Sequence, residues 1–239
     1  MQNVNTRIIR FLDTDNKTVV SAYRLFQRPD GKNLVFYPVP KNANSSFKKL
    51  FVELLSIEKD YLFLDDDIPM HQKKLYQLNS NKNSWLWSFL PPKPRFTIMP
   101  SSLNAIKIAV VRDPIERFLS AYNNRLNWHK DIGFYNLSIK DVIKKLKENS
   151  FDNQHFLPQT FFLGNNPNYF NYISKMPSID GLVDYINQFF GKNLKIKKLQ
   201  TNHGENPMTL EEVSKFSNDL KYIYKKDYEF INSIEGNLI

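Results

Sequence analysis

The sequence predicts an α/β fold with a central parallel sheet flanked by helices and a mostly helical C-terminal half. Two largely apolar runs, residues 34–39 and 106–111, are typical of strands that are buried on both faces, with Lys107 as the one charged residue. Each run is followed by apolar residues at helical spacing, and strands that alternate with helices indicate a parallel sheet. The length of 239 residues suits a single domain over residues 1–239.

The first half of the chain supplies the predicted strands. Residues 1–30 allow two interpretations, extra edge strands or a flap over a bound ligand. The strand at residues 34–39 leads through a turn at residues 40–44 into a helix. The buried face of that helix is marked by an i, i+3, i+4 pattern: Phe47, Leu50, Phe51, Leu54 and Leu55. A further strand is expected at residues 61–64.

Capping residues mark where the later helices begin. Pro114 stands where a first helical residue is expected, with Asp113 before it as the cap. Three more helices are predicted from their start signals: Ser138 with Asp141, Asp180 with a stop at Gly191, and Thr209 with Glu212. A last amphipathic helix is expected over residues 220–231.

The composition excludes several kinds of chemistry. The chain has no cysteine, and its four histidines, at 71, 129, 155 and 203, are too scattered for a zinc site. The formal net charge of +9 favours anionic partners. No run approaches the length of about 18 apolar residues that spans a membrane, and no signal peptide is recognised. We therefore expect a cytoplasmic protein.

The first strand–turn–helix has the layout of a phosphate-binding loop. The N-terminus of a helix presents unpaired N–H groups and a partial positive charge, which attract phosphate. Lys41 lies in the turn, and Ser45 and Ser46 offer hydroxyls on the first helical turn. In place of the glycines of a Walker motif the turn carries Asn42 and Asn44, which we expect to adopt the left-handed conformation. An ordinary turn with an exposed lysine is the alternative interpretation.

A second candidate anion site follows the strand at residues 106–111. Arg112 stands at the carboxyl end of this strand, where ligands of open α/β sheets bind, and Ser120 lies two helical turns further on. A guanidinium with a nearby hydroxyl can bind a phosphate through charge-assisted hydrogen bonds. The alternative is that Arg112 only pairs with Asp113 or Glu116.

Together the two sites resemble the donor site of sulfotransferases. Residues 40–46 are similar to the 5′-phosphosulfate loop of that family, and residues 112–122 are similar to its 3′-phosphate segment. Three further segments, in the same order, resemble the carbohydrate sulfotransferases that include the chondroitin and HNK-1 enzymes: residues 70–75, 155–159 and 224–228. The resemblance runs from residue 35 to about residue 231, nearly the whole chain.

This resemblance implies a single, P-loop-like sulfotransferase domain with three layers. Such an enzyme transfers a sulfuryl group from 3′-phosphoadenosine-5′-phosphosulfate (PAPS) to a hydroxyl, expected here on a carbohydrate, and releases 3′,5′-adenosine bisphosphate. Lys41 would stabilise the departing phosphate, and no metal would be required. The residues implied at the 5′-phosphate are Lys41, Asn42, Ala43, Asn44, Ser45 and Ser46. Those implied at the 3′-phosphate are Arg112 and Ser120.

A histidine has the suitable pKa to take the proton from the acceptor hydroxyl. His71 is the first choice because it follows the strand expected at residues 61–64, and His155 is the second. Arg117, His155 and His203 are candidates for contacts with the acceptor or for secondary roles.

Two other functions stay open at this point. A P-loop-type kinase would share the phosphate cradle, but it needs a Gly-Lys-Ser/Thr triplet that the loop lacks. A non-catalytic polyanion-binding protein would use the net charge alone. Nucleic acid is not expected as a partner, because the densest basic runs carry no interleaved aromatic residues.

Overall fold

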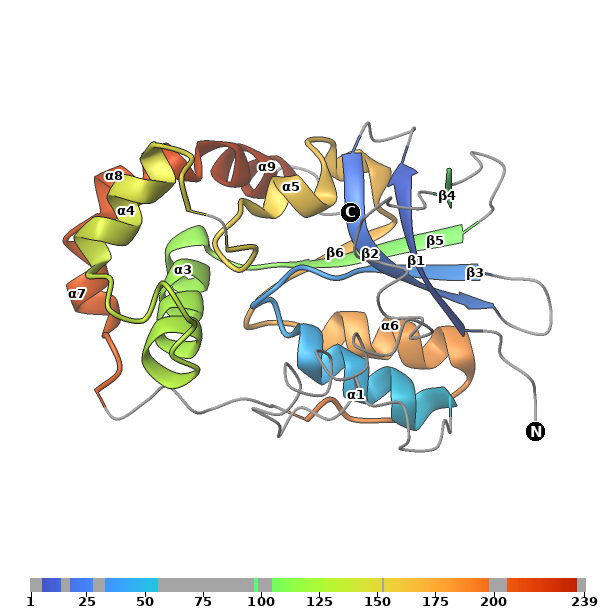
Figure 1. The fold of residues 1–239 in the computed structure, drawn as a ribbon. Helices are drawn as coiled ribbons and strands as arrows, with labels where there is room; N and C mark the ends of the chain where they lie inside the picture. The colour runs from blue at the N-terminus through green and yellow to red at the C-terminus, as the bar shows by residue number, and fades with distance from the viewer. Residues whose placement is uncertain are drawn as a thin grey trace, which may run out of the picture.

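A mixed sheet forms the centre of the computed structural model, which describes residues 6–13, 18–27, 33–55, 97–98, 105–151, 153–197 and 206–235. Within this part of the chain the strands form one six-stranded sheet in the order β4–β1–β2–β3–β5–β6 (Figure 1). The strands are β1 (Thr6–Asp13), β2 (Thr18–Gln27), β3 (Asn33–Tyr37), β4 (Thr97–Ile98), β5 (Ala105–Val111) and β6 (Tyr172–Lys175). The pairs β3–β5 and β5–β6 are parallel, which confirms the predicted parallel core, whereas β1–β2 and β2–β3 are antiparallel.

Both faces of β3 and β5 are buried, because successive side chains of a strand point to opposite faces. Leu34 and Phe36 of β3 pack on one face against α1 and α6, whereas Val35 and Tyr37 pack on the other face against α5 and α9. These helices are α1 (Asn44–Leu55), α5 (Gln159–Leu163), α6 (Asp180–Phe190) and α9 (Lys225–Glu235). Figure 1 shows the resulting three layers, with helices above and below the sheet.

A helical lobe lies beyond the carboxyl ends of β3 and β5, at the left of Figure 1. Its elements are α3 (Pro114–Tyr122), the π-helix η2 (Asn123–Trp128), α4 (Ile139–Lys147), α7 (Leu210–Ser214) and α8 (Ser217–Ile223). Phe118 of α3 lies at the centre of its core, with Val142 of α4 and Leu220 of α8 in the same cluster. The lobe therefore closes the end of the sheet at which ligands of α/β folds bind.

The predicted caps of α3, α4 and α7 are confirmed, whereas α6 begins at Asp180 as predicted but has Ile179 as its cap, without a side-chain hydrogen bond. The side chain of Asp113 accepts hydrogen bonds from the backbone N–H groups of Ile115 and Glu116, with Pro114 as the first residue of α3. Capping boxes join Ser138 to Asp141 at α4 and Thr209 to Glu212 at α7. The helix α6 ends at Gly191, which has the left-handed conformation that ends many helices.

Other predictions need correction. The single last helix expected over residues 220–231 is two helices, α8 and α9, which are separated at Tyr224. The strand β6 and the short 3₁₀ helix η3 (Pro167–Tyr169) interrupt the half that was expected to be mostly helical. Residues 1–30 contribute the antiparallel pair β1–β2. The strand expected at residues 61–64 lies outside the described residues.

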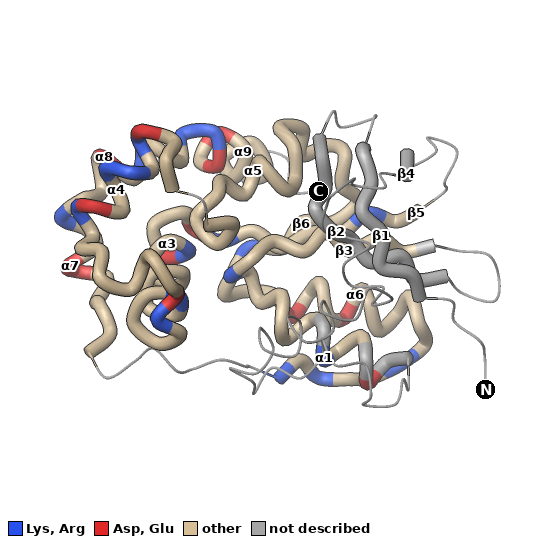
Figure 2. The backbone as a smooth tube through the Cα atoms, viewed as in Figure 1, with Lys and Arg blue, Asp and Glu red and all other residues tan. Residues whose placement is uncertain are grey.

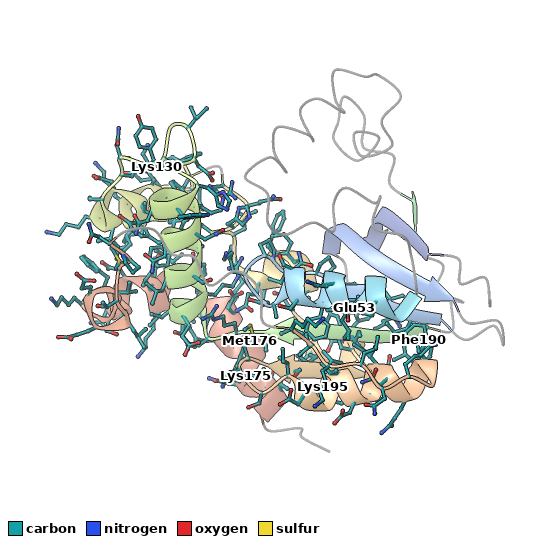
Figure 3. The ribbon with its side chains drawn as sticks, turned by 90° about the horizontal axis from the view of Figure 1, so that it is seen from below. Glu53, Lys130, Lys175, Met176, Phe190 and Lys195 are labelled. Atoms are coloured by element: carbon teal, nitrogen blue, oxygen red, sulfur yellow. The ribbon has the colours of Figure 1, made fainter. Side chains whose placement is uncertain are left out.

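The segment after α6 runs back along α1. Leu194 and Ile196 pack against the core shared by these two helices, and Lys197 Nζ lies 3.4 Å from Glu53 Oε1. Figure 3 shows Glu53 on α1 and Lys195 on this returning segment, on the side of the sheet covered by α1 and α6. Within the described part of the chain, no helix has the length and apolar character needed to cross a bilayer.

Candidate active site

The turn between β3 and α1 has an unusual backbone. Lys41 and Ala43 have positive φ angles of 71° and 53°, whereas Asn42 and Asn44 are not in the left-handed region. The prediction that the two asparagines adopt this conformation is therefore wrong. A turn in which the sign of φ changes between neighbouring residues directs consecutive N–H groups to one side, as in anion-binding nests.

The side chain of Asn42, between the two residues with positive φ, anchors the turn to the rest of the site. Asn42 is buried, and its Nδ2 donates to the carbonyl oxygen of Val110 at 2.8 Å and to Gln159 Oε1 at 2.6 Å. The Gln159 side chain in turn bonds the backbone of Arg112 on both sides, accepting from its N–H at 3.0 Å and donating to its carbonyl at 2.8 Å. The lysine-bearing turn, the end of β5 and the start of α5 are thus fixed to one another.

Arg112 lies beside the lysine-bearing turn. Its Nη1 reaches the carbonyl oxygen of Lys41 at 3.5 Å, and its Nε lies 3.4 Å from Glu116 Oε2. Ser120 is one helical turn beyond Glu116 and shares that face of α3. The two interpretations of Arg112 are therefore compatible, because it pairs with Glu116 while its guanidinium borders the turn.

Arg117 is buried and donates to three backbone carbonyl oxygens. Its Nε bonds Pro40 at 2.9 Å, its Nη1 bonds Leu157 at 2.7 Å, and its Nη2 bonds His155 at 3.2 Å. Each of its three nitrogens therefore has a protein partner. Arg117 joins the lysine-bearing turn to the segment that precedes α5.

The segment at residues 224–228 bonds the start of α5 and the residues before it. Tyr224 donates from its hydroxyl to the carbonyl oxygen of Phe156 at 2.8 Å. Asp227 is buried and caps α5, accepting from the N–H groups of Gln159 and Thr160 at 2.7 and 2.9 Å and from the hydroxyl of Thr160 at 2.9 Å. The segments at residues 155–159 and 224–228 are thus in contact, and together they fix Gln159, which bonds Asn42 and Arg112.

The charges around Lys41 change its protonation. Burial, followed by the charges of Arg125, Arg112 and Arg117, lowers the pKa of Lys41 to about 7. Figure 2 shows basic positions in the turn before α1 and others at the start of and along α3, which faces it. So many cations around one lysine are costly unless an anion lies among them. The site is built to receive a negative charge.

Two histidines belong to this electropositive region. Burial and the nearby Arg125 lower the pKa of His129, and burial with the charges of Arg125 and Lys41 lowers the pKa of His155 well below its ordinary value. The ring of His155 lies 3.0 Å from Asn153 Oδ1 through its Nδ1. His155 is therefore a neutral ring close to the lysine.

The structure brings most of the sequence-predicted residues to one place. The turn after β3 and the start of α1 hold Lys41, Asn42, Ala43, Asn44, Ser45 and Ser46, and Arg112 follows β5. Arg117 lies on α3 and bonds the carbonyls of Pro40 and His155. Ser120 lies further along α3. His71 and His203 lie outside the described residues, so their positions stay predictions. The sequence reasoning missed Arg125, Asp131 and Asn153, because no motif contains them. Arg125 and Asp131 are six positions apart, a spacing that does not place two side chains on the same face of a helix.

A family model identifies the family of the chain. The model of the sulfotransferase family matches residues 24–232. The chain belongs to the sulfotransferase family. No curated protein and no solved structure matches it. The matched range includes β3, α1, β5 and α3, and so the whole of the site described above.

Membership of the family assigns the reaction type. A sulfotransferase moves a sulfuryl group to an acceptor, and the family implies that the acceptor atom is a hydroxyl oxygen. The arrangement of cations at the ends of β3 and β5 suits this chemistry, because the protein must position charged groups and neutralise the charge that develops on the leaving group.

Proposed function

We propose that this sulfotransferase uses PAPS as its donor and a carbohydrate hydroxyl as its acceptor. The observation that carries the proposal is the contact between the Arg112 guanidinium and the backbone of Lys41, at 3.5 Å. It supports a site in which the lysine-bearing turn and the start of α3 act on one ligand. PAPS has anionic groups at both ends of its ribose, which suits two such positions.

The start of α1 is the proposed site of the 5′-phosphate. The first N–H groups of a helix have no partner within the helix, so those of Asn44, Ser45 and Ser46 can donate to phosphate oxygens. Buried oxygens of Asn42 and Asn44, both Oδ1, have no hydrogen-bond partner among the described residues. Because an amide oxygen only accepts hydrogen bonds, a phosphate cannot pair with these two atoms, and the proposed phosphate site rests on the N–H groups.

Lys41 is the proposed stabiliser of the leaving group. In the reaction the acceptor oxygen forms a bond to sulfur while the bond between sulfur and the bridging oxygen breaks, leaving charge on the 5′-phosphate. An ammonium group in this partly buried position offsets that charge more strongly than it would in water. The donor itself raises the pKa of Lys41 again, since its anionic groups favour the protonated amine.

Arg112 and Ser120 are the proposed ligands of the 3′-phosphate. A guanidinium can bind two phosphate oxygens at once. Ser120 lies one helical turn beyond Glu116, the residue that Arg112 pairs with, and offers a hydroxyl on the same helix. These two groups would distinguish PAPS from adenosine nucleotides that lack the 3′-phosphate. Arg117 is proposed as a positioning residue, because each of its three nitrogens donates to a backbone carbonyl.

The proposal of a carbohydrate acceptor is supported by the segment that follows η2. Trp128 and Tyr135 are 44% and 49% exposed, and the segment between them is held by the ion pair of Arg125 and Asp131 at 2.6 Å. Neighbouring His129 lies within the electrostatic reach of Lys41. Exposed aromatic faces beside polar groups suit the apolar faces and the hydroxyls of a sugar ring.

The proton of the acceptor hydroxyl needs a base, which we assign to one of two histidines. His71 stays the candidate from the sequence, and His155 is the candidate within the described residues.

Incubation with sulfur-labelled PAPS and a panel of glycans tests the proposal. Transfer of label to a glycan is expected, with release of 3′,5′-adenosine bisphosphate. A thermal-shift comparison of 3′,5′-adenosine bisphosphate, ATP and DNA separates the alternatives, because a ligand that binds the folded state stabilises it. Stabilisation by ATP alone would favour a kinase, and stabilisation by DNA alone would favour a polyanion-binding protein.

A further inference from the structure

Four side chains form a continuous series of hydrogen bonds that ends at His155. Arg125 of η2 donates to both oxygens of Asp131, from Nε at 2.8 Å and from Nη2 at 2.6 Å. Asn153 donates from Nδ2 to Asp131 Oδ2 at 3.2 Å. His155 Nδ1 then lies 3.0 Å from Asn153 Oδ1. Arg125 and Asn153 are buried, and the Asp131 side chain is largely buried.

This series of bonds determines where the protons lie. The carboxylate of Asp131 can only accept, so Asn153 must turn its Nδ2 toward it and its Oδ1 toward the histidine. The N–H of His155 also donates to that oxygen, at 3.1 Å, which supports the same orientation. A carbonyl oxygen can only accept, so Nδ1 of His155 carries the ring proton. The other ring nitrogen, Nε2, therefore carries a lone pair.

The surroundings of His155 keep the ring neutral. The charged and titratable groups that act on it come from each neighbouring element: Arg125 and His129 from η2 and its end, Lys41 from the turn before α1, and Arg117 from α3. In the ligand-free protein all of them oppose a second proton on the ring, and burial opposes it more strongly. Asp131 does not reverse this effect, because Arg125 neutralises it and Asn153 separates it from the ring. The anionic donor proposed above would offset these positive charges, so that Nε2 can take up a proton while the donor is bound.

We propose that His155 is the general base of sulfuryl transfer and that Asn153 and Asp131 are its positioning residues. The inference rests on the proposed function. Nε2 takes the proton of the acceptor hydroxyl, the freed oxygen forms the new bond to sulfur, and the bond from sulfur to the bridging oxygen breaks. The electron pair of that bond leaves with the 5′-phosphate, beside Lys41. His155 then returns its proton to water.

The tautomer is tested without any reaction. The chain has four histidines, and in ring NMR spectra of protein labelled with ¹⁵N-histidine the signal of His155 is the one that His155→Gln removes. His155 should carry its proton on Nδ1 and stay neutral down to a pH well below that of an ordinary histidine. In Asn153→Ala the ring should populate both tautomers. A single Nε2-protonated form in the unmodified protein would overturn the proposal.

Kinetics test the role. His155→Gln should lower kcat by at least about 100-fold, within the range usual for loss of a general base, with the Kd for 3′,5′-adenosine bisphosphate changed less than about threefold. Asn153→Ala should lower kcat by about tenfold at unchanged donor binding, a loss on the scale of a positioning group. The matched control is Asn187→Ala, which removes a buried asparagine that bonds both backbone groups of Leu194 on the far side of the sheet. It should leave kcat and the His155 tautomer unchanged.

The outcomes separate this inference from the function on which it rests. If the unmodified protein binds 3′,5′-adenosine bisphosphate and His155→Gln keeps near-normal kcat, His155 is not the base and the donor assignment stands. If the unmodified protein binds no bisphosphate and transfers no label, the proposed function and this inference fall together. A loss of kcat in Asn187→Ala equal to that in Asn153→Ala would overturn the positioning role, because general destabilisation would then explain both.

Discussion

The guanidinium of Arg112 lies 3.5 Å from the carbonyl oxygen of Lys41, although the two residues are 71 positions apart in the chain. The contact joins the carboxyl ends of two neighbouring parallel strands, β3 and β5. It brings the two candidate anion sites of the sequence to the same side of the sheet. An arrangement with the two on opposite sides would have excluded a shared ligand.

Replacement of Arg112 by alanine should affect one end of the donor only. The Kd for 3′,5′-adenosine bisphosphate should rise roughly 10–100-fold, as expected for loss of a charge-assisted hydrogen bond. The Kd for 5′-AMP, which lacks the 3′-phosphate, should change much less. Titration calorimetry with both ligands measures the difference. Glu116→Gln is the control and should not weaken either ligand, whereas equal losses for both ligands in Arg112→Ala would remove Arg112 from the 3′-phosphate site.

The affinity for 3′,5′-adenosine bisphosphate should depend on pH through Lys41. With a pKa of about 7, this amine is charged below pH 7 and loses its charge above it. A bound phosphate favours the charged amine, so binding above pH 7 takes up a proton and weakens by up to about tenfold per pH unit. Lys41→Arg should abolish this slope, because arginine stays charged. An affinity of the unmodified protein that is constant from pH 7 to 9 would contradict the assignment.

The lowered pKa of Lys41 also makes the stability of the ligand-free protein depend on pH, and this stability should rise with pH. The folded state holds the Lys41 proton less tightly than the unfolded state does, so the cost of this lysine is fully present below pH 7. That cost decreases as the pH rises from 7 toward 10.5, the ordinary value. Lys41→Met should therefore stabilise the ligand-free protein at pH 6.5, while it abolishes transfer. Denaturant unfolding at pH 6.5 measures this change. A clear loss of stability in Lys41→Met would show that the charged amine of Lys41 does not destabilise the folded state.

Asn42→Ala should destabilise the fold. The substitution removes two buried hydrogen bonds that join the lysine-bearing turn to β5 and α5, at a cost of about 2–3 kcal/mol. For a domain of this size the melting temperature should fall by roughly 5–10 °C. Asn168→Ala, at an exposed asparagine of η3, is the matched control and should change it by about 1 °C or less. Similar melting temperatures for the two variants would mean that Asn42 does not fix the turn.

Trp128→Ala tests the carbohydrate acceptor. If the exposed indole binds a sugar ring, the KM for the glycan should rise about tenfold, while the Kd for 3′,5′-adenosine bisphosphate is unchanged. Tyr222→Ala removes a 75% exposed aromatic side chain of α8 and should change neither constant. Equal KM values for both variants would place the acceptor away from the segment that follows η2.

Local patterns in the sequence predicted the framework of the site well. The runs at β3 and β5 are almost wholly apolar because both faces of these strands are covered, and Lys107 is the one charged residue in β5. Asp113 and Pro114 could be assigned to the start of α3 because capping depends on residues two or three positions apart. The same locality explains why Ser138 and Thr209 were assigned correctly.

The relationships that the sequence could not supply are those between distant residues. The motif around Arg112 contains Arg117, but only the fold shows that its partners are carbonyls 38 to 77 positions away. The buried hydrogen bond of Asn42 to Gln159 joins residues 117 positions apart, and no local pattern places Lys41 and Ala43 in the left-handed region. The strand β6 has only four residues and ends in Ser174 and Lys175, so it has no apolar pattern of its own.

Binding of 3′,5′-adenosine bisphosphate, 5′-AMP and 3′-AMP to the unmodified protein, compared by titration calorimetry, tests the shared donor site most directly. If the lysine-bearing turn and the start of α3 bind the two ends of one nucleotide, the bisphosphate should bind one-to-one and at least about tenfold more tightly than either monophosphate. Equal affinities for the bisphosphate and one monophosphate, or two independent sites, would contradict this account.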